Sequence, residues 1–243
     1  MLEIIKRYSY ALRTKLRHAR GGCNVKNNTD GLVLMFHDVN EGKTDTRAFV
    51  SNIAEYREYI SELAKTRTPC PLDEIVSGEC NGKFAVTFDD GFASVYEYVY
   101  PFMKEHNIPF TVFVTVDFID KEGYLTREQL KQLDADELCT IGSHCVTHPL
   151  LRKCKNAYGE MADSKELLEQ LLGHEVKSVA YPYGSILACS AKNKRQAERA
   201  GYDYAFSAIN GYMNSYNKRQ RFFLPRFNGD PLVKRYTEEN TNK

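Results

Sequence analysis

Residues 83–91 read KFAVTFDDG, an apolar run that ends in two adjacent aspartates and a glycine. The run predicts a strand, and Asp89 and Asp90 fall where that strand should end. Neighbouring strand residues point to opposite sides, so the two carboxylates cannot easily share one task while the strand lasts. The stretch is therefore either an ordinary polar turn or a place where two aspartates do different jobs.

Apolar runs and helical patterns alternate on both sides of this stretch. Repeated strand–helix units imply parallel strands with helices outside, in a barrel or a doubly wound sheet. We expect one α/β domain over residues 31–230, followed by a polar tail at 231–243. The expected strands are 31–37, 83–90, 109–116, 138–144, 178–184, 202–208 and 222–227, and the expected helices are 47–65, 94–107 (kinked at Pro101), 126–133, 158–172 and 190–200.

The amino-terminal segment 1–22 is predicted to be separate from this domain. Residues 2–20 place apolar side chains at helical spacing among many lysines and arginines, and Gly21-Gly22 ends the pattern. Two interpretations stay open: a helix packed on the domain, or an amphipathic basic helix that docks on a membrane surface or a partner.

Composition excludes several classes of protein. The 243 residues carry a formal net charge of +1, so no global field favours nucleic acid. No apolar stretch approaches the roughly 18 residues of a membrane-spanning helix. The seven cysteines are odd in number and form no C-x-x-C pair, which argues against a disulfide framework and a zinc ribbon. Free thiols fit a reducing compartment, and residues 1–22 lack the apolar core of a secretory signal. We therefore expect a cytoplasmic protein, with peripheral contact at the inner membrane surface through residues 2–20.

Unusual polar residues gather at the predicted carboxyl ends of the strands. Parallel α/β folds place their sites at this edge. The residues are His37-Asp38, Asp89-Asp90, Ser143-His144, Pro182-Tyr183-Gly184 and Arg226.

His144 and His148 are four residues apart, one helical turn, so both imidazoles can face one point. Two histidines and a carboxylate suit a divalent metal with open coordination positions. Taken alone, such a pair is more often a surface or capping feature, and a lone His37 is more often a buried core residue. The convergence of these side chains on one edge favours a site.

The motifs TFDDG (87–91), SHCVTHP (143–149), AYPYG (180–184) and LPR (224–226) resemble the polysaccharide deacetylases of carbohydrate esterase family 4. The resemblance runs from about residue 31 to 228. It implies a distorted (β/α)7-type barrel of parallel strands with outer helices. LMFHDV (34–39) is similar to a branch of the family in which the catalytic histidine precedes TFDDG.

The resemblance assigns different jobs to the two aspartates. It implies that Asp89 is the catalytic base and that Asp90, His144 and His148 are the metal ligands. His37 would protonate the departing amine, and the Tyr183 backbone N–H would help to hold the oxyanion. A metal lowers the pKa of a bound water toward ~7, and a second, unligated carboxylate can then take its proton.

One position departs from the family pattern. Many members carry an arginine where this chain has Ala180, and there it orients the base. We predict that Arg226 takes over by pairing with Asp89, against the alternative of a surface arginine. Cys145, between the two histidines, is expected to be an inert thiol rather than a fourth ligand.

The sequence thus predicts a metal-dependent hydrolase that removes N-acetyl groups from an amino sugar in a polysaccharide or glycan intermediate. Zinc is the expected metal, with cobalt, nickel or iron as alternatives. A catalytically dead sugar-binding module and a non-haem iron oxygenase are the competing hypotheses, and the latter has no use for Asp89.

Overall fold

The computed structural model describes residues 30–42, 50–214 and 220–241. Its centre is a sheet in which seven strands follow the order β10-β1-β5-β6-β7-β8-β9, and β4 pairs with β5 beside this path. Every pairing in the sheet is parallel. The strands are β1 (Leu32–Phe36), β4 (Thr68–Pro69), β5 (Lys83–Phe88), β6 (Phe110–Val114), β7 (Cys139–Ser143), β8 (Ser178–Ala180), β9 (Tyr204–Phe206) and β10 (Phe227–Asn228).

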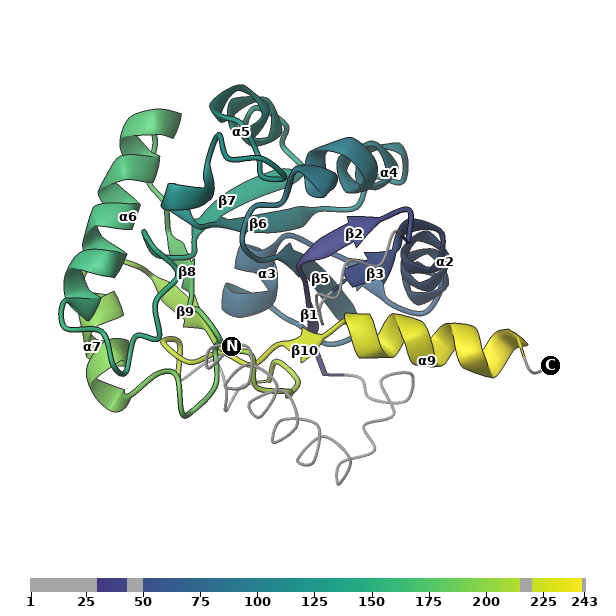
Figure 1. Cartoon of the computed structure of the whole chain (residues 1–243). Coiled ribbons are helices and arrows are strands. Elements are labelled where there is room, and N and C mark those ends of the chain that lie inside the picture. The colour runs from purple at the N-terminus through teal and green to yellow at the C-terminus, as the bar shows by residue number, and fades with distance from the viewer. Residues whose placement is uncertain (1–29, 43–49, 215–219, 242–243) are drawn as a thin grey trace, which may run out of the picture.

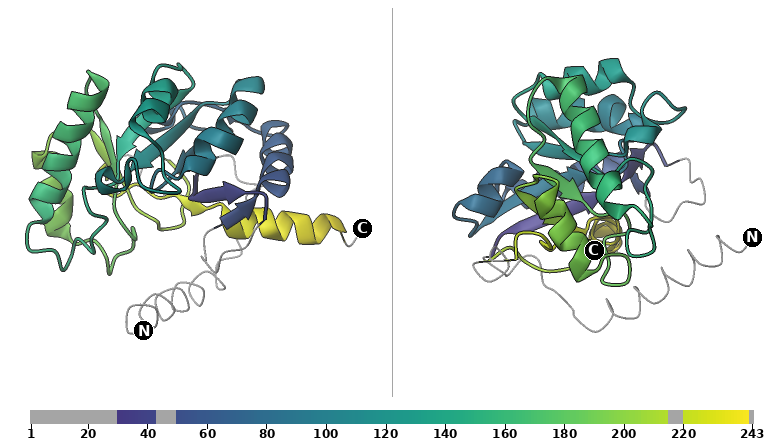
Figure 2. Two further views of the ribbon diagram at one scale, coloured as in Figure 1. Left: turned by 45° about the horizontal axis from the view of Figure 1, so that its top comes forward. Right: turned by 90° about the vertical axis from the view of Figure 1, so that its left-hand side faces the viewer.

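Helices surround this sheet, and a second, two-stranded sheet lies beside it (Figure 1). Helices α6 and α7 pack side by side along one flank (Figure 2). The small sheet pairs β2 (Asp38–Asn40) with β3 (Val50–Asn52). The helices are α2 (Ile53–Ala64), α3 (Leu72–Ser77), the π-helix η1 (Val95–Val99), α4 (Tyr100–Glu105), the 3-10 helix η2 (Val116–Phe118), α5 (Arg127–Asp134), α6 (Ala157–Leu172), α7 (Ala191–Arg199) and α9 (Asp230–Thr241).

The two edges of the main sheet approach each other through the chain that precedes β10. Leu224 forms a parallel bridge with Phe206 of β9, and Phe227 then pairs with Leu34 of β1. The sheet therefore curls into an incompletely closed barrel, which confirms the expected distorted barrel of parallel strands with outer helices.

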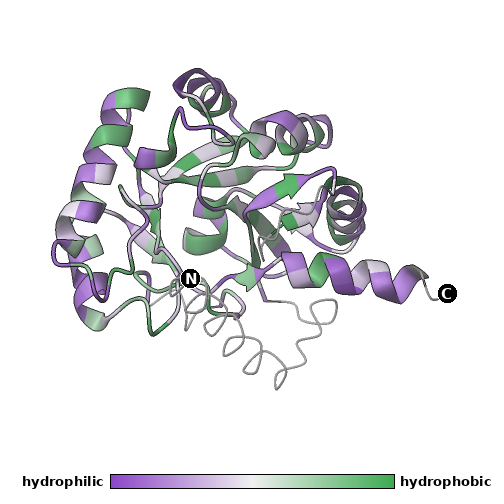
Figure 3. Cartoon of the chain, viewed as in Figure 1, coloured by the Kyte–Doolittle hydropathy of each residue, from purple (hydrophilic) through white to green (hydrophobic). Residues whose placement is uncertain are grey.

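Alternation along the strands produces two buried faces. Leu34 and Phe36 of β1 pack in a large cluster with the helices, whereas Val33 belongs to a second cluster that also contains Phe113 and Phe206. Successive side chains of a strand point to opposite faces, so the second cluster fills the interior of the barrel. Figure 3 shows the hydrophobic colouring concentrated on the strands and hydrophilic colouring along the outer sides of the helices.

Four helices, α2, α5, α6 and α7, begin at a residue whose side chain caps them. The Thr126 side chain accepts a hydrogen bond from the Gln129 backbone, and the Gln129 side chain accepts one from the Thr126 backbone, so a capping box begins α5 as expected. Asn52 caps α2. The helix predicted at 47–65 therefore begins at Ile53, and residues 50–52 form β3 instead. The predicted kink at Pro101 takes the form of η1, in which the Tyr100 N–H donates to Val95 O, followed by α4.

Two expectations at the carboxyl end were wrong in detail. The predicted strand 222–227 is confined to Phe227–Asn228, because Pro225 has no N–H to donate and the Arg226 N–H donates to Ile209 O. Arg226 thus precedes a strand instead of ending one. The expected polar tail at 231–243 forms most of α9, in which Val233 is buried and the Tyr236 ring packs on Tyr59 of α2.

The predicted amphipathic helix 2–20 lies outside the described residues. Among the helices that the structure does describe, none has both the length and the apolar character needed to cross a lipid bilayer.

Candidate active site

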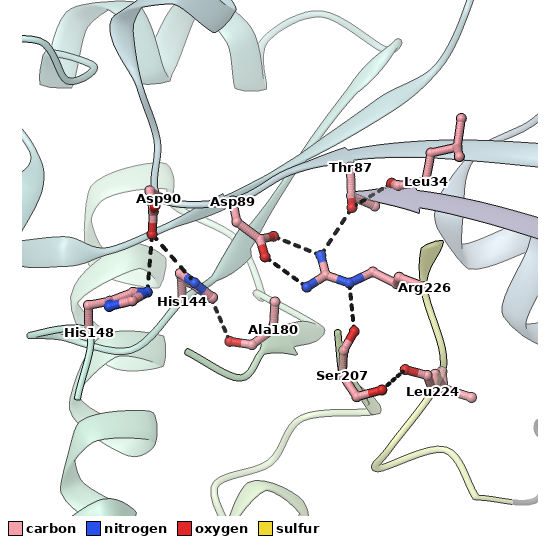
Figure 4. Close-up of polar contacts among 10 residues, drawn as sticks. All are labelled: Leu34, Thr87, Asp89, Asp90, His144, His148, Ala180, Ser207, Leu224 and Arg226. Carbon is pink, nitrogen blue, oxygen red and sulfur yellow. Dashed lines mark hydrogen bonds and ion pairs between the residues drawn. The ribbon is translucent and has the colours of Figure 1, made fainter. Parts of the chain in front are cut away.

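Three side chains that could hold a metal ion come together at the carboxyl edge of the barrel. Asp90 follows β5, and His144 follows β7. An Asp90 carboxylate oxygen lies 3.5 Å from His144 Nε2 and 3.3 Å from His148 Nε2 (Figure 4). Among the described residues, this is the one group of three or more His, Cys, Asp and Glu side chains whose ligand atoms all lie within 4.8 Å of one another.

The donor set of this cluster fits a divalent ion. Bonds of about 2.1 Å in tetrahedral geometry separate neighbouring ligand atoms by about 3.4 Å, close to the two separations given above. His144 Nδ1 lies 2.7 Å from Ala180 O, so its N–H donates to that carbonyl. This leaves the lone pair on Nε2, the atom that faces Asp90. Burial lowers the pKa of His144 to about 3, which keeps the imidazole neutral, as a metal ligand must be.

The loop that carries His148 is not helical, although the spacing of the two histidines suggested a helical turn. Cys145 and His148 both adopt the left-handed backbone region, with φ of 67° and 57°. Glu160 of α6 fastens this loop by accepting hydrogen bonds from the backbone N–H groups of Val146 and Thr147 and from the Thr147 hydroxyl. The sequence did not single out Glu160, because it is one of several charged residues in the predicted helix 158–172.

Strained backbone gathers around the site. Asp90 and Tyr183 also have positive φ, at 75° and 61°. A left-handed conformation costs roughly 1–2 kcal/mol in a residue other than glycine, and such residues collect at functional sites. Gly91, with φ of 82°, lets the chain turn directly after the second aspartate without that cost.

The first aspartate lies in a different environment. Asp89 is 3% exposed and receives two hydrogen bonds from Arg226, at 2.7 and 2.8 Å (Figure 4). The pairing predicted from the sequence is therefore present, and the surface alternative for Arg226 is wrong. Arg226 is itself fully buried, over the rings of Phe113 and Phe206 in the barrel interior.

Further hydrogen bonds fix the guanidinium. Its Nη1 also donates to the Thr87 hydroxyl, which in turn donates to Leu34 O, and its Nε donates to Ser207 O. Thr87 and Ser207 thus set the position of Arg226. Sequence reasoning missed both, although Thr87 belongs to the TFDDG motif.

Arg226 and two histidines together outweigh the effect of burial on the pKa of Asp89. Burial alone would raise the pKa of this carboxyl, but Arg226, His144 and His37 together lower it to about 2. Asp89 is therefore ionised at neutral pH. Each carboxylate oxygen has two lone pairs, so the bidentate pairing leaves Asp89 able to accept a further hydrogen bond.

The remaining predicted residues flank this centre. His37 follows β1, is half-buried, and lies near enough to Asp89 to affect its pKa. Tyr183 follows β8, and its ring packs edge-on against His148 with centroids 4.8 Å apart. Cys145 is fully buried in the large hydrophobic cluster, and burial raises the pKa of its thiol, as expected for an inert side chain.

Ala180 stands where the resemblance to the family led us to expect an arginine. Its carbonyl orients His144, and its methyl lies in the interior cluster that also contains Phe113 and Phe206, the two rings beneath the Arg226 guanidinium. The guanidinium thus reaches Asp89 from another part of the chain.

The profile of the polysaccharide deacetylase family matches residues 79–205, more than half of the chain. The chain belongs to the polysaccharide deacetylase family. The match confirms the resemblance drawn from the motifs. It includes Asp89, Asp90, His144 and His148, whereas His37 and Arg226 lie outside the matched segment.

Individual relatives agree with this membership. YxkH of Bacillus subtilis (strain 168), which carries the name of a polysaccharide deacetylase, is 27% identical over 179 residues, covering 70% of this chain and 61% of YxkH. The poly-beta-1,6-N-acetyl-D-glucosamine N-deacetylase of Staphylococcus aureus (strain MSSA476) is 26% identical over 158 residues, covering 56% of this chain and 53% of that enzyme. This family member thus spans 61% and 53% of the length of these two curated relatives.

A solved structure shares the fold over nearly its whole length. Streptococcus pyogenes deacetylase PplD in complex with acetate superimposes with a TM-score of 0.75 at 19% identity, covering 87% of this chain and 98% of PplD. At this identity the likeness establishes the fold of this family member.

Proposed function

We propose that this chain is a metal-dependent N-deacetylase that hydrolyses the N-acetyl group of an amino sugar within a glycan. The observation that carries the proposal is the placement of an ionised, unligated Asp89 beside an Asp–His–His cluster. The name of the Staphylococcus aureus relative supports an N-acetylated glucosamine polymer as the substrate class.

Asp90, His144 and His148 would hold the metal, with zinc as the expected ion and cobalt, nickel or iron as alternatives. When bound, a divalent ion supplies Lewis acidity to the oxygen atoms that take part in the reaction.

The other residues move protons and stabilise charge. Asp89 accepts a proton from the water that attacks the acetyl carbonyl, and Arg226 holds that carboxylate in place. The Tyr183 N–H donates to the oxyanion, a contact worth roughly 2.7–4 kcal/mol where one such donor has been measured. His37 protonates the nitrogen as the C–N bond breaks, so acetate and a free amine leave.

Two other functions compete with this proposal. A non-haem iron oxygenase would use the Asp–His–His cluster but has no task for Asp89. A catalytically dead sugar-binding module was suggested by the missing family arginine, and the Arg226–Asp89 pair removes that reason for expecting inactivity.

The test is acetate release by the metal-reconstituted full chain from a panel of N-acetylated sugars, oligomers and lipid-linked sugar intermediates. The proposal expects release with and without oxygen, and a fall of about 10²–10⁴-fold in His37→Ala. His106→Ala, in a residue beyond the end of α4, serves as the matched control and should keep the parent rate. Activity that requires oxygen would support the oxygenase instead, and sugar binding without acetate release would support the binding module.

We also propose that the protein works in the cytoplasm, in contact with the inner membrane surface through residues 2–20. The cysteines at positions 70, 80, 139, 145, 154 and 189 are all free thiols, which supports a reducing compartment. An anionic surface attracts each Lys or Arg by roughly 1 kcal/mol. Deletion of residues 1–22 should therefore weaken binding to anionic vesicles and leave hydrolysis of a small soluble substrate intact, and equal vesicle binding by both forms would remove the membrane part of the proposal.

A further inference from the structure

The two most exposed large hydrophobic side chains among the described residues lie beside the candidate site, and the proposed chemistry does not use them. Ile186 is 47% exposed and Leu187 is 55% exposed. They occupy the loop between β8 and α7, three and four residues after Tyr183, whose ring packs against His148. Three residues of chain span at most about 11 Å, so this apolar pair lies at the rim of the site.

A second loop is attached to the loop that carries the apolar pair. Arg152 follows the loop of the two histidines, and its backbone N–H donates to Ala188 O at 2.9 Å. Its Nη1 donates to Ile186 O at 3.3 Å. The Asn193 side chain, in the first turn of α7, donates to Leu151 O. The two loops and the start of α7 therefore form one continuous surface beside the site.

This surface is basic. Exposed cations accompany the apolar pair on the second loop and on α7, and they are Arg152, Lys153, Lys155 and Lys192. Residues 150–157 and 185–197 contain no aspartate or glutamate. The carboxylates that follow these segments are Glu160, which accepts hydrogen bonds from backbone N–H groups, and Glu198 in the last turn of α7. Within the described residues no salt bridge neutralises the four cations.

The other side of the site carries the opposite charge. The strand order places β6 and β8 on either side of β7. The loop after β6 exposes Asp117, Asp120 and Glu122 against a single lysine, Lys121. Attraction to an anionic partner is therefore confined to the side of the site formed by the loops after β7 and β8.

An apolar pair among cations fits a lipid surface better than the other anionic partners. Exposed apolar patches with a polar rim mark interaction sites. Lysine is depleted from protein–protein interfaces. At an anionic membrane, by contrast, lysine and arginine are attracted to the headgroups, and apolar side chains enter the boundary between headgroups and acyl chains. A nucleic acid or an anionic glycan would engage the cations but offers no apolar layer to Ile186 and Leu187.

We propose that this surface docks on an anionic phospholipid membrane, with Ile186 and Leu187 inserted among the lipids and the cations at the headgroups. The barrel itself makes this contact, which is separate from the proposed contact through residues 2–20. Docking holds the rim of the candidate site at the membrane surface. The substrate class that this placement favours, an N-acetylated sugar carried by a lipid, rests on the proposed function.

The closing experiment measures cosedimentation of the full chain with mixed vesicles of phosphatidylglycerol and phosphatidylcholine, without substrate. Lys153→Gln/Lys155→Gln removes two cations and should bind about 25-fold more weakly than the parent, because each cation near an anionic surface contributes about fivefold. Ile186→Ser/Leu187→Ser removes the apolar pair and should bind about tenfold more weakly. Vesicles of phosphatidylcholine alone should bind the parent weakly.

Matched control variants change similar side chains elsewhere on the molecule. Leu167→Ser alters a leucine of α6 that is 44% exposed. Lys234→Gln/Arg235→Gln removes the same charge from α9, which lies on the flank opposite α6 and α7 (Figure 1). Both controls should bind the mixed vesicles as the parent does, so a loss confined to the two test variants locates the contact.

Insertion is tested by fluorescence. The chain contains no tryptophan, so Leu187→Trp introduces a single reporter at the apolar pair. Its emission should shift to shorter wavelength on the mixed vesicles and should be quenched by brominated lipid. Leu167→Trp on α6 should show neither change.

Two results would overturn the inference. The first is equal vesicle binding by Ile186→Ser/Leu187→Ser and the parent, together with unshifted emission from Leu187→Trp. The second is binding to soluble heparin that depends on Lys153 and Lys155 without binding to vesicles, which would identify an anionic glycan as the partner. Because these measurements need no turnover, a failure to release acetate would contradict the proposed function and leave the docking test in force.

Discussion

The two aspartates of TFDDG are adjacent in sequence but belong to regions built on different principles. On one side, Asp89 and Arg226 are buried in the barrel interior, and every contact of the guanidinium is made with a fixed partner. On the other, Asp90 and His148 are partly exposed and lie on turns with left-handed backbone. The first region surrounds a charge with buried partners, whereas the second is open to solvent. The proposed hydrolysis needs both, because its base must keep its position while substrate and product bind and leave.

The largest expected effect comes from the open region. His148→Ala removes a ligand, so the metal should be lost and turnover should fall to that of the metal-free protein. His174→Ala serves as the control, because this exposed histidine pairs with Asp134 away from the cluster. This variant should retain both the metal and the parent turnover. Metal content by plasma emission spectrometry and acetate release check this prediction, and full metal occupancy in His148→Ala would contradict the ligand assignment.

Next comes the buried region, where Arg226→Met leaves the Asp89 carboxylate without its partner. Removing one member of a buried ion pair costs about 3–5 kcal/mol, so the midpoint of urea unfolding should fall strongly. Arg226→Lys keeps the charge but loses the paired geometry of the guanidinium, and it should lie in between. The exposed Arg221→Met should unfold as the parent does, and an unchanged midpoint for Arg226→Met would show that the pair is not held as described.

The pH dependence of stability provides a further test of the buried region. The folded pKa of Asp89 is lowered to about 2, below its value of roughly 3.9 in the unfolded chain. Its contribution to stability is therefore complete above about pH 4 and is lost as the pH falls toward 2. Between pH 5 and pH 2.5 the parent should lose about 2 kcal/mol more unfolding free energy than Asp89→Asn/Arg226→Met, and equal losses in denaturant titrations would contradict the lowered pKa.

A smaller effect is expected where α6 fastens the ligand loop. Glu160→Ala removes three hydrogen bonds to Val146 and Thr147 without touching a ligand. Residues that orient metal ligands typically contribute 10–100-fold to metal affinity, and we expect the lower end because the loop backbone remains. Glu166→Ala, on the exposed side of the same helix, provides the control in a competition titration with a chelator. Equal metal affinity in the two variants would exclude a role for Glu160.

The sequence predicted the parts of this molecule that depend on local pattern. Strand–helix alternation predicted the parallel architecture, and the strand-end motifs predicted that Asp90, His144 and His148 lie together and that Arg226 pairs with Asp89. Prediction from the sequence failed where contacts between separate elements determine the structure. Val233 alone did not reveal that α9 docks on α2, and two left-handed residues, not a helix, bring His144 and His148 together. Glu160 escaped notice because its importance lies in the loop N–H groups that it binds, 13 and 14 residues earlier in the chain.

The division of labour within TFDDG is the central claim, and one measurement tests it most directly: metal content and acetate release in Asp89→Asn beside Asp90→Asn. We predict that Asp89→Asn keeps most of its metal and loses about 10²–10⁴-fold in turnover, whereas Asp90→Asn loses both. Asp120→Asn, in an exposed pair with Arg127, should change neither. Loss of metal from Asp89→Asn but not from Asp90→Asn would reverse the two assignments, and acetate release by Asp89→Asn at the parent rate would contradict the account as a whole.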